Sequence, residues 1–397
     1  MLRSLKFKNF QSFVDETEVL FELPKGAPAR GYERRAEDGT RLTTVLAAFG
    51  ANASGKTALL KPAAFLFWFM KSSFSLDVDA DIPLPARLLN PEDPSEFEVI
   101  FDDLDGETWK YELKLTEKRV LWEALYKKFT RFSYIFKRKW NAENESYDVQ
   151  LQQFDLAAQV ARRVRHNASL IATARQHESK STEFIDTYIA HYNVDIDGRP
   201  HYLNNLDYAN EAFQTFDNVR EQAVKILRSW DLGLDSFEVK KENFVDAAGK
   251  TKTLLRSYFQ HKRKDGRDFT LPYEVESNGT QSAYVLLALL IPVLQVGGLA
   301  VIDEMESDLH PHLLESLLRL FDSEETNPFG AQLFFTSHTT KVLDYVSKAQ
   351  TYFVEKTDCV STAFRGDQVQ GLRSDDNLRA KYEAGAIGAL PEVRSDV

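Results

Sequence analysis

Cysteine is nearly absent from this sequence. Cys359 is the only one in 397 residues, so no disulfide can form within the chain, and the composition suits a reducing compartment. No run of about 18 uncharged apolar residues is present, so we expect no transmembrane helix. The first residues, MLRSLKFKNFQSF, alternate basic and apolar side chains and lack the apolar core of a secretory signal. We therefore expect a cytoplasmic protein with no membrane partner.

Positive charge is also in short supply. The 49 lysines and arginines are outnumbered by 60 aspartates and glutamates, which gives a formal net charge of −11. This balance argues against a surface coated for nucleic acid. Local basic grooves remain open, but a solvated face is favoured over nucleic-acid contact for each candidate cluster. The clusters are Lys137-Arg138-Lys139, Arg162-Arg163 with Arg165, and Lys262-Arg263-Lys264 with Arg267.

Apolar residues are plentiful, and their spacing predicts the elements of the first half. The hydrophobic content of 43% is enough for one large domain or two modest ones. Residues 1–22 and 96–126 alternate as strands do, with a hairpin turn at Asp105-Gly106. Between them, residues 43–50 predict a buried strand, followed by a helix that contains Pro62.

The second half predicts helices, then strands, then alternating strands and helices. Residues 150–232 have helical apolar spacing, and residues 235–275 return to strand-like alternation. The final third alternates strands and helices, which predicts an α/β fold with a mostly parallel core sheet. We divide the chain into an N-terminal part with an antiparallel β lobe, a mainly helical insertion and a C-terminal part: residues 1–130, 131–232 and 233–397.

The stretch GANASGKT, from Gly50 to Thr57, matches the phosphate-loop pattern G-x-x-x-x-G-K-[ST] between a predicted strand and helix. Its glycines let the backbone wrap phosphate oxygens, and the helix N-terminus offers N–H donors. Lys56 would neutralise the β- and γ-phosphates of ATP, and Thr57 would place its hydroxyl on Mg²⁺. The predicted nucleotide-binding residues are Gly50, Asn52, Ser54, Gly55, Lys56 and Thr57.

Carboxylates follow a second buried strand, in LAVIDE. Asp303 and Glu304 come at its carboxyl end, where α/β sheets bind ligands. We expect Asp303 to hold Mg²⁺ together with Thr57, and Glu304 to orient or deprotonate the attacking water. His338 ends the strand LFFTS and is expected near the γ-phosphate. Lys56, Glu304 and His338 are thus the predicted catalytic residues.

Together, GANASGKT, SNGTQ, VIDE, SDLHP and TSH resemble the nucleotide-binding head of ABC-type ATPases. The N-terminal LKFKNFQSF resembles the branch that holds structural-maintenance (SMC), RecF and overcoming-lysogenization (OLD) proteins. The resemblance implies a homodimer, or a higher homo-oligomer, with ATP bound between two heads. Ser277 and Gly279 of one head would then cap the γ-phosphate held by the other, with Asp308 at the same interface. By itself, Ser277 is equally an ordinary helix N-cap.

The C-terminal stretch looks like the tail of AbiL- and RloA-like abortive-infection ATPases. Tyr382, Gly385, Gly388 and Pro391 occupy the positions of a Tyr-x-x-Gly-x-x-Gly-x-x-Pro pattern. OLD proteins continue into a Toprim nuclease domain, for which this sequence has no room after Pro391. The resemblance therefore implies that the effector, for instance a nuclease, is encoded separately.

Three functions follow as hypotheses. The first is an anti-phage ATPase that senses infection and controls an effector protein. The alternative is a RecF-like DNA-binding ATPase of DNA repair, which would bind DNA in a salt-sensitive way. A transporter ATPase subunit is the third, and the aromatic-rich segment between residues 96 and 232 disfavours it.

Overall fold

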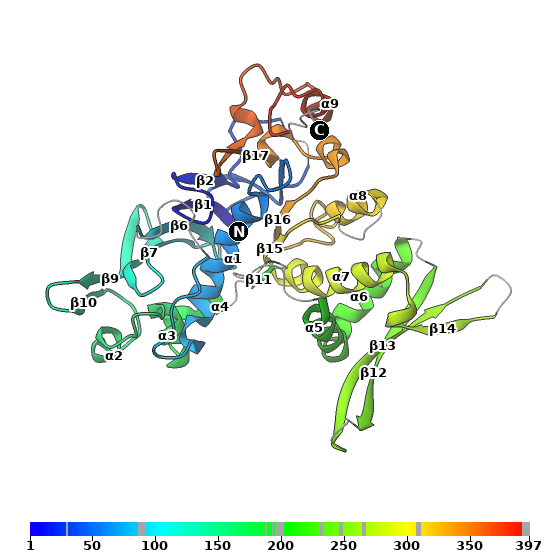
Figure 1. Ribbon diagram of the computed structural model, residues 1–397, viewed down its shortest axis with the longest axis horizontal. Coiled ribbons are helices and arrows are strands. Elements are labelled where there is room, and N and C mark those ends of the chain that lie inside the picture. Colours follow the sequence, from blue (N-terminus) through cyan, green and yellow to red (C-terminus); the bar gives the residue numbers. More distant parts are fainter. Residues whose placement is uncertain are drawn as a thin grey trace.

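A computed structural model describes residues 1–28, 31–85, 93–186, 189–192, 194, 202–230, 233–245, 249–263, 267–306 and 311–390. Figure 1 shows two lobes on either side of a central sheet: an antiparallel sheet with short helices on one side, and a helical layer with a projecting hairpin on the other. The predicted α/β fold, with a β lobe and a mostly parallel core, is confirmed.

The central sheet carries the elements that matter for function. Its strand order is β11-β15-β16-β5-β17-β18, and only the last pair is antiparallel among the described strands. Parallel strands end at the same edge of a sheet, so their carboxyl ends can share one site. The strands are β5 (Val45–Gly50), β11 (Ile189–Tyr192), β15 (Gly298–Ile302), β16 (Gln332–Thr336), β17 (Thr351–Thr357) and β18 (Val360–Arg365).

Both faces of this sheet are buried, which explains its uninterrupted apolar strands. In β5, Leu46 and Ala48 belong to the core beneath the antiparallel lobe, whereas Ala47 and Phe49 belong to the core beneath the helical layer. The alternation follows from the two-residue period of a strand. The phosphate-loop strand is therefore fixed from both sides.

An antiparallel sheet forms the N-terminal lobe, in the order β10-β9-β8-β7-β6-β1-β2 within the described residues. Its inner face packs on α1 (Lys56–Ser72), the helix that follows the phosphate loop. The strands are β1 (Leu2–Lys8), β2 (Thr17–Leu20), β6 (Ser95–Asp102), β7 (Thr108–Leu115), β8 (Val120–Lys128), β9 (Phe132–Asn141) and β10 (Ser146–Leu151).

One boundary of the predicted insertion is wrong. The insertion was expected to be mainly helical from residue 131, but residues 132–151 form β9 and β10 and extend the antiparallel sheet. The helical apolar spacing begins only near residue 150, and β9 and β10 continue the series of hairpins from β8. The helices begin later: α2 (Ala158–Arg162), α3 (Leu170–Gln176), α4 (Glu183–Asp186), α5 (Tyr202–Thr215) and α6 (Asp217–Ser229). The three-part division itself stays a prediction.

The helical layer on the other face contains α5, α6, α7 (Asn278–Val296) and α8 (Pro311–Arg319). A sheet of β12 (Leu234–Val245), β13 (Thr251–His261) and β14 (Phe269–Pro272) projects from it, as Figure 1 shows. A small hairpin, β3 (Glu33–Arg35) with β4 (Arg41–Thr43), and α9 (Leu378–Glu383) complete the described elements.

Helix α7 qualifies the expectation about membrane segments. Among the described residues it is the one helix that is long and apolar enough to cross a bilayer, with a mean hydropathy of 1.5 over its best window. However, 61% of that window is buried inside the protein. A core helix passes the same length and composition test, so this helix is weak evidence for a membrane span.

The C-terminal tyrosine motif lies against the phosphate-loop strand. Tyr382 is buried, with its ring 5.9 Å from that of Phe49 and 5.3 Å from that of Phe353. Its hydroxyl donates to the carbonyl oxygen of Ala389 at 3.2 Å. The two motif glycines both have positive φ, which explains the choice of glycine. Pro391, the last motif residue, is outside the described residues.

Candidate active site

The phosphate loop connects β5 to α1, and its glycines are enforced by close neighbours. A Cβ on Gly50 would lie 2.3 Å from the carbonyl oxygen of Val354 on β17. Gly55 has a φ of 112°, and a Cβ there would lie 2.4 Å from the Ser361 hydroxyl. These contacts explain both glycines by steric exclusion, in addition to access for phosphate.

Lys56 holds its ammonium group beside the loop. Its Nζ donates to the carbonyl oxygens of Gly50 at 2.9 Å and Ala51 at 2.8 Å. Burial lowers the pKa of Lys56, while the nearby carboxylates of Asp303 and Glu304 oppose this shift. A cation that is costly to bury and held only by carbonyls is prepared to bind a phosphate anion.

Asp303 stands at the carboxyl end of β15 and is tied to two hydroxyls. Its Oδ2 accepts a hydrogen bond from Thr57 Oγ1 at 2.9 Å, and its Oδ1 accepts one from Thr336 Oγ1 at 2.6 Å. The side chain is buried, so these bonds compensate for lost hydration. The sequence separates Asp303 from Thr57 by more than two hundred residues, and the parallel sheet brings them into contact.

Glu304 adopts an unusual backbone conformation. Its φ is 47°, in the left-handed region that non-glycine residues seldom occupy. The conformation is held by the Thr336 hydroxyl, which accepts the backbone N–H of Glu304 at 2.7 Å. Strain of this kind collects at functional sites, where the surroundings over-determine one geometry. Thr336 therefore holds the Asp303 carboxylate and the Glu304 backbone at once.

His338 and Glu306 meet beyond the end of β16. The backbone N–H of His338 donates to Oε1 of Glu306, a residue that the sequence did not single out. Oε2 of Glu306 is buried and has no hydrogen-bond partner in the described part of the chain. The loop after β15 and the loop after β16 are thereby linked.

A pocket of about 670 Å³ unites these groups. It contains the predicted Lys56, Thr57, Asp303, Glu304 and His338, together with Asn52 and Gly55. Ser54 lines the opposite side of the loop, where its buried Oγ has no partner among the described residues. The pocket is lined by Gln11, Ser12, Asn52, Ala53, Gly55, Lys56, Thr57, Ala58, Lys61, Asp303, Glu304, His338 and Lys356.

Several of these groups escaped sequence-based prediction. Lys61 on α1 and Lys356 on β17 reach the pocket without a local motif. Gln11 and Ser12 stood inside the quoted stretch LKFKNFQSF, and Thr336 stood inside TSH, but none of the three was given a role. Ser361 on β18 also supports the site, because its hydroxyl donates to the Ser54 carbonyl at 2.6 Å. The same hydroxyl lies 2.7 Å from that of Ser12.

The signature residues are not part of this pocket within one chain. Ser277 and Gly279 are absent from the described lining. Ser277 is the N-cap of α7, where its Oγ accepts the backbone N–H of Thr280 at 3.2 Å. This geometry fits the N-cap role, and it does not test whether Ser277 contacts a nucleotide bound to a second chain. Asp308 is outside the described residues.

The donor set fits a magnesium ion with a nucleotide. Mg²⁺ prefers hard oxygen ligands, and it is commonly held by one or two protein groups plus substrate phosphates. Thr57 Oγ1 and the Asp303 carboxylate are in direct contact and supply such oxygens. Within the described residues no cluster of three or more His, Cys, Asp or Glu offers an all-protein metal site.

Comparison with known protein families finds a matching family. Residues 47–344 match the family model described as "AAA domain, putative AbiEii toxin, Type IV TA system". The chain belongs to this family. The matched range covers three quarters of the chain and includes the phosphate loop, Asp303, Glu304 and His338. As an AAA-domain protein, the chain is of the nucleotide-binding ATPase type. The finer likeness to AbiL and RloA proteins stays a prediction.

Solved structures provide looser similarities. The SMC head domain from Thermotoga maritima is 16% identical with a TM-score of 0.43, and covers 92% of this chain and 98% of its own. An Smc head domain from Pyrococcus yayanosii is 10% identical with a TM-score of 0.47, and covers 97% and 99%. RecF with a bound ATP analogue is 11% identical with a TM-score of 0.41, and covers 92% and 98%. No curated protein sequence matches the chain. At scores below 0.5 these similarities are too loose to assign residues or functions.

Proposed function

We propose that this protein is a magnesium-dependent ATPase that closes as a homodimer, or a higher homo-oligomer, around ATP. It would use this cycle to control a separately encoded effector in anti-phage defence. One observation carries the ATPase part: Lys56, Thr57, Asp303, Glu304 and His338, from three strand ends, line one pocket.

The phosphate loop would bind the triphosphate. Its backbone N–H groups and the N-terminus of α1 attract anions. Lys56 would exchange its two loop carbonyls for phosphate oxygens, a stronger charge-assisted contact. Thr57 and Asp303 would hold Mg²⁺, which stabilises the charge that develops on the phosphates.

Glu304 would then orient or deprotonate the attacking water. Its left-handed backbone, held by Thr336, supports a fixed direction for the carboxylate. His338 would contact the γ-phosphate from the neighbouring strand end, where its backbone is held by Glu306. Together these contacts would position the attacking water and the γ-phosphoryl group that is transferred to it as ADP leaves, which is the main task in phosphoryl transfer.

The second chain would complete the site. Ser277 and Gly279 do not line the pocket of their own chain, and they lie at the positive N-terminus of α7. Placed against the γ-phosphate of a partner chain, this helix end would cap the nucleotide, and Asp308 would lie at the same interface. ATP would then hold the pair together, and hydrolysis would release it.

The defence proposal is supported by the family description, which names a putative AbiEii toxin and a Type IV TA system. A reducing compartment such as the cytoplasm is supported by the single cysteine, Cys359. The described chain has no other candidate centre of comparable chemistry, so effector activity would come from a second protein.

The test uses the parent operon and a Lys56→Ala variant. Purified parent protein should hydrolyse ATP only with Mg²⁺, and Lys56→Ala should lose nucleotide binding. Tagged parent protein should retain a neighbouring gene product and protect cells from phage plaques, and Lys56→Ala should lose protection. Equal hydrolysis by both proteins would refute the site. Protection that needs no neighbouring gene would refute the effector.

A further inference from the structure

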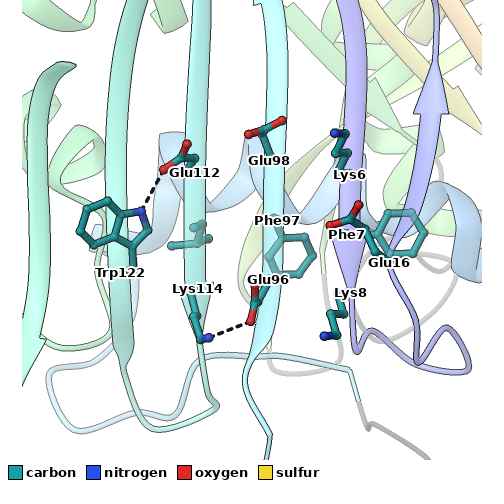
Figure 2. A pocket seen from close by; sticks show the side chains of 11 residues that line it. Lys6, Phe7, Lys8, Glu16, Glu96, Phe97, Glu98, Glu112, Lys114 and Trp122 are labelled. Carbon is teal, nitrogen blue, oxygen red and sulfur yellow. Dashed lines mark hydrogen bonds and ion pairs between the residues drawn. The ribbon is translucent and has the colours of Figure 1, made fainter. Parts of the chain in front are cut away.

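The outer face of the antiparallel sheet has a composition that the ATPase site does not explain. Side chains of a strand alternate between faces. Phe97, Leu113 and Leu125 turn inward to the core. Figure 2 shows the outward neighbours on β1, β6, β7 and β8, where charged side chains stand in rows across the strands. The two halves of this face differ in character.

The half nearest β1 is a neutral ladder. Lys6 pairs with Glu18 at 3.4 Å, and Lys114 pairs with Glu96 at 2.7 Å. Cross-strand pairs of opposite charge are the usual stabilisation of a solvated sheet face. This half needs no ligand to explain it.

The half formed by β8 and β9 carries four aromatic rings among lysines. Tyr126 lies opposite Tyr134, and Trp122 lies opposite Lys139, so their side chains share the outward face. All four rings are partly exposed. We name this half the aromatic–lysine face, defined by Trp122, Tyr126, Phe132, Tyr134, Lys137 and Lys139.

Lysines already lie over these rings. The Lys137 ammonium is 4.6 Å from the centre of the Tyr134 ring, and the Lys110 ammonium is 4.4 Å from that of Tyr126. The flat faces of these rings are therefore turned toward groups on the surface, rather than packed edge-on into the core. Lys110 is also ion-paired with Glu98 and Glu112. A planar ligand could therefore stack on Tyr134 by displacing the Lys137 head.

The basic triplet Lys137-Arg138-Lys139 is divided by the sheet. Arg138 is fully buried and forms an ion pair with Glu123 at 3.4 Å, so it is not part of any surface patch. Lys137 and Lys139 point outward, and neither has an ion pair in the described part of the chain. Carboxylates border these two lysines. Asp148 on β10 lies opposite Lys139, and Glu112 accepts hydrogen bonds from Trp122 Nε1 at 3.1 Å and from the Tyr126 hydroxyl at 3.0 Å. The ammonium of Lys137, which has no ion pair in the described part of the chain, therefore lies at the Tyr134 end of the face, beside a ring that Glu112 does not hold.

We propose that the aromatic–lysine face binds single-stranded nucleic acid. Unpaired bases stack on aromatic rings, while lysines neutralise the backbone phosphates. A protein partner is less suited, because lysine is depleted at protein interfaces. A duplex is less suited because its base faces are already stacked inside the helix. Such a ligand would offer the proposed sensor a phage-derived or host-derived trigger.

The same sheet connects this face to the ATP pocket. Its inner surface packs on α1, the helix that begins at Lys56. The proposal does not depend on hydrolysis, since none of the six residues lines the nucleotide pocket. Failure of nucleic-acid binding would therefore leave the proposed ATPase function standing.

The test is fluorescence anisotropy of the full chain with labelled 20-nucleotide single-stranded DNA, the matching RNA, and a DNA duplex, at low salt. We expect both single strands, or one of them, to bind more tightly than the duplex. Tyr134→Ala should weaken binding by about 5- to 100-fold, the range for loss of one stacking partner. Tyr134→Phe, which keeps the ring, should bind like the parent.

Two further variants separate stacking from charge. Lys137→Gln should weaken binding and reduce the slope of log affinity against log salt by about 0.7. Lys6→Gln, on the neutral half of the same sheet face, should leave affinity and slope unchanged. All variants should keep the parent ATPase rate, which shows that they fold.

The proposal is overturned if no strand binds at low salt, if the duplex binds as tightly as the single strands, or if Tyr134→Ala binds like Tyr134→Phe. A preference for RNA or for DNA supports it and identifies the type of strand.

Discussion

Replacing Thr336 by valine removes one hydroxyl and keeps the branched shape of the side chain. That hydroxyl donates to Asp303 at 2.6 Å and accepts the N–H of Glu304 at 2.7 Å, in a fully buried position. The variant would leave one carboxylate oxygen and one backbone N–H without this partner. Glu304 would also lose the bond that supports its left-handed backbone.

The magnitude follows from these two bonds. Each buried polar group that loses its partner costs about 1–3 kcal/mol, so the loss of both bonds should lower the free energy of unfolding by about 2–6 kcal/mol. Residues that orient metal ligands and catalytic groups typically cost 10- to 100-fold in activity or metal affinity when replaced. We therefore expect kcat to fall about 10- to 100-fold, and the Mg²⁺ concentration that gives half the maximal rate to rise.

The assay is steady-state ATP hydrolysis across a Mg²⁺ titration, with a fluorescent nucleotide measuring binding separately. Nucleotide affinity without metal should change little, because Lys56 and the loop are untouched. Thr336→Ser keeps the hydroxyl and should retain most of the rate. A Thr336→Val protein with the parent kcat and the parent Mg²⁺ dependence would show that the hydroxyl does not position Asp303 and Glu304.

Three further perturbations test other parts of the site. Gly55→Ala should weaken nucleotide binding about 5- to 100-fold, because position 55 has a positive φ and a Cβ there would clash with Ser361. The double variant Gly55→Ala with Ser361→Gly should recover part of the lost affinity. Full affinity in Gly55→Ala alone would contradict the steric account. Ser277→Asp keeps an N-cap acceptor but removes the hydroxyl donor, so it should fold and bind ATP yet lose turnover; normal turnover would reduce Ser277 to a cap. Burial lowers the pKa of Lys56, so in the nucleotide-free protein its ammonium group should lose its proton at a pH below the ordinary lysine pKa of about 10.4. Nucleotide affinity should therefore fall as the pH rises toward that value. An affinity that does not change with pH over this range would contradict a charged Lys56 contact.

Residues within local motifs were predictable because their chemistry is written in a few adjacent positions. Lys56 and Thr57 follow from the phosphate loop, and Asp303 and Glu304 follow from a buried strand that ends in carboxylates. The strand order that unites them was inferred only as a mostly parallel sheet. Its confirmation rests on the pairing of β15, β16, β5 and β17.

Residues that depend on tertiary packing were not predictable in this way. Thr336 matters because its buried hydroxyl reaches the next strand, and Ser361 matters because β18 passes behind the loop. For Thr336 and Ser361, a segment far away in the sequence decides the outcome. Residues 132–151 are a different case, because β9 pairs with its neighbours β8 and β10 in consecutive hairpins, and the boundary of the helical insertion was placed too early. Arg138 was grouped with surface lysines, although the strand period turns it inward.

The proposal that a second chain completes the ATP site is tested most directly by the mass of a Glu304→Gln protein in solution. This variant should bind ATP with Mg²⁺ but not hydrolyse it, so the closed assembly should persist. Size-exclusion chromatography with light scattering should show the mass of the nucleotide-free state doubling when ATP is added. Glu304→Gln combined with Ser277→Arg should bind ATP without that increase. A Glu304→Gln protein that is saturated with ATP and keeps its nucleotide-free mass would contradict the account.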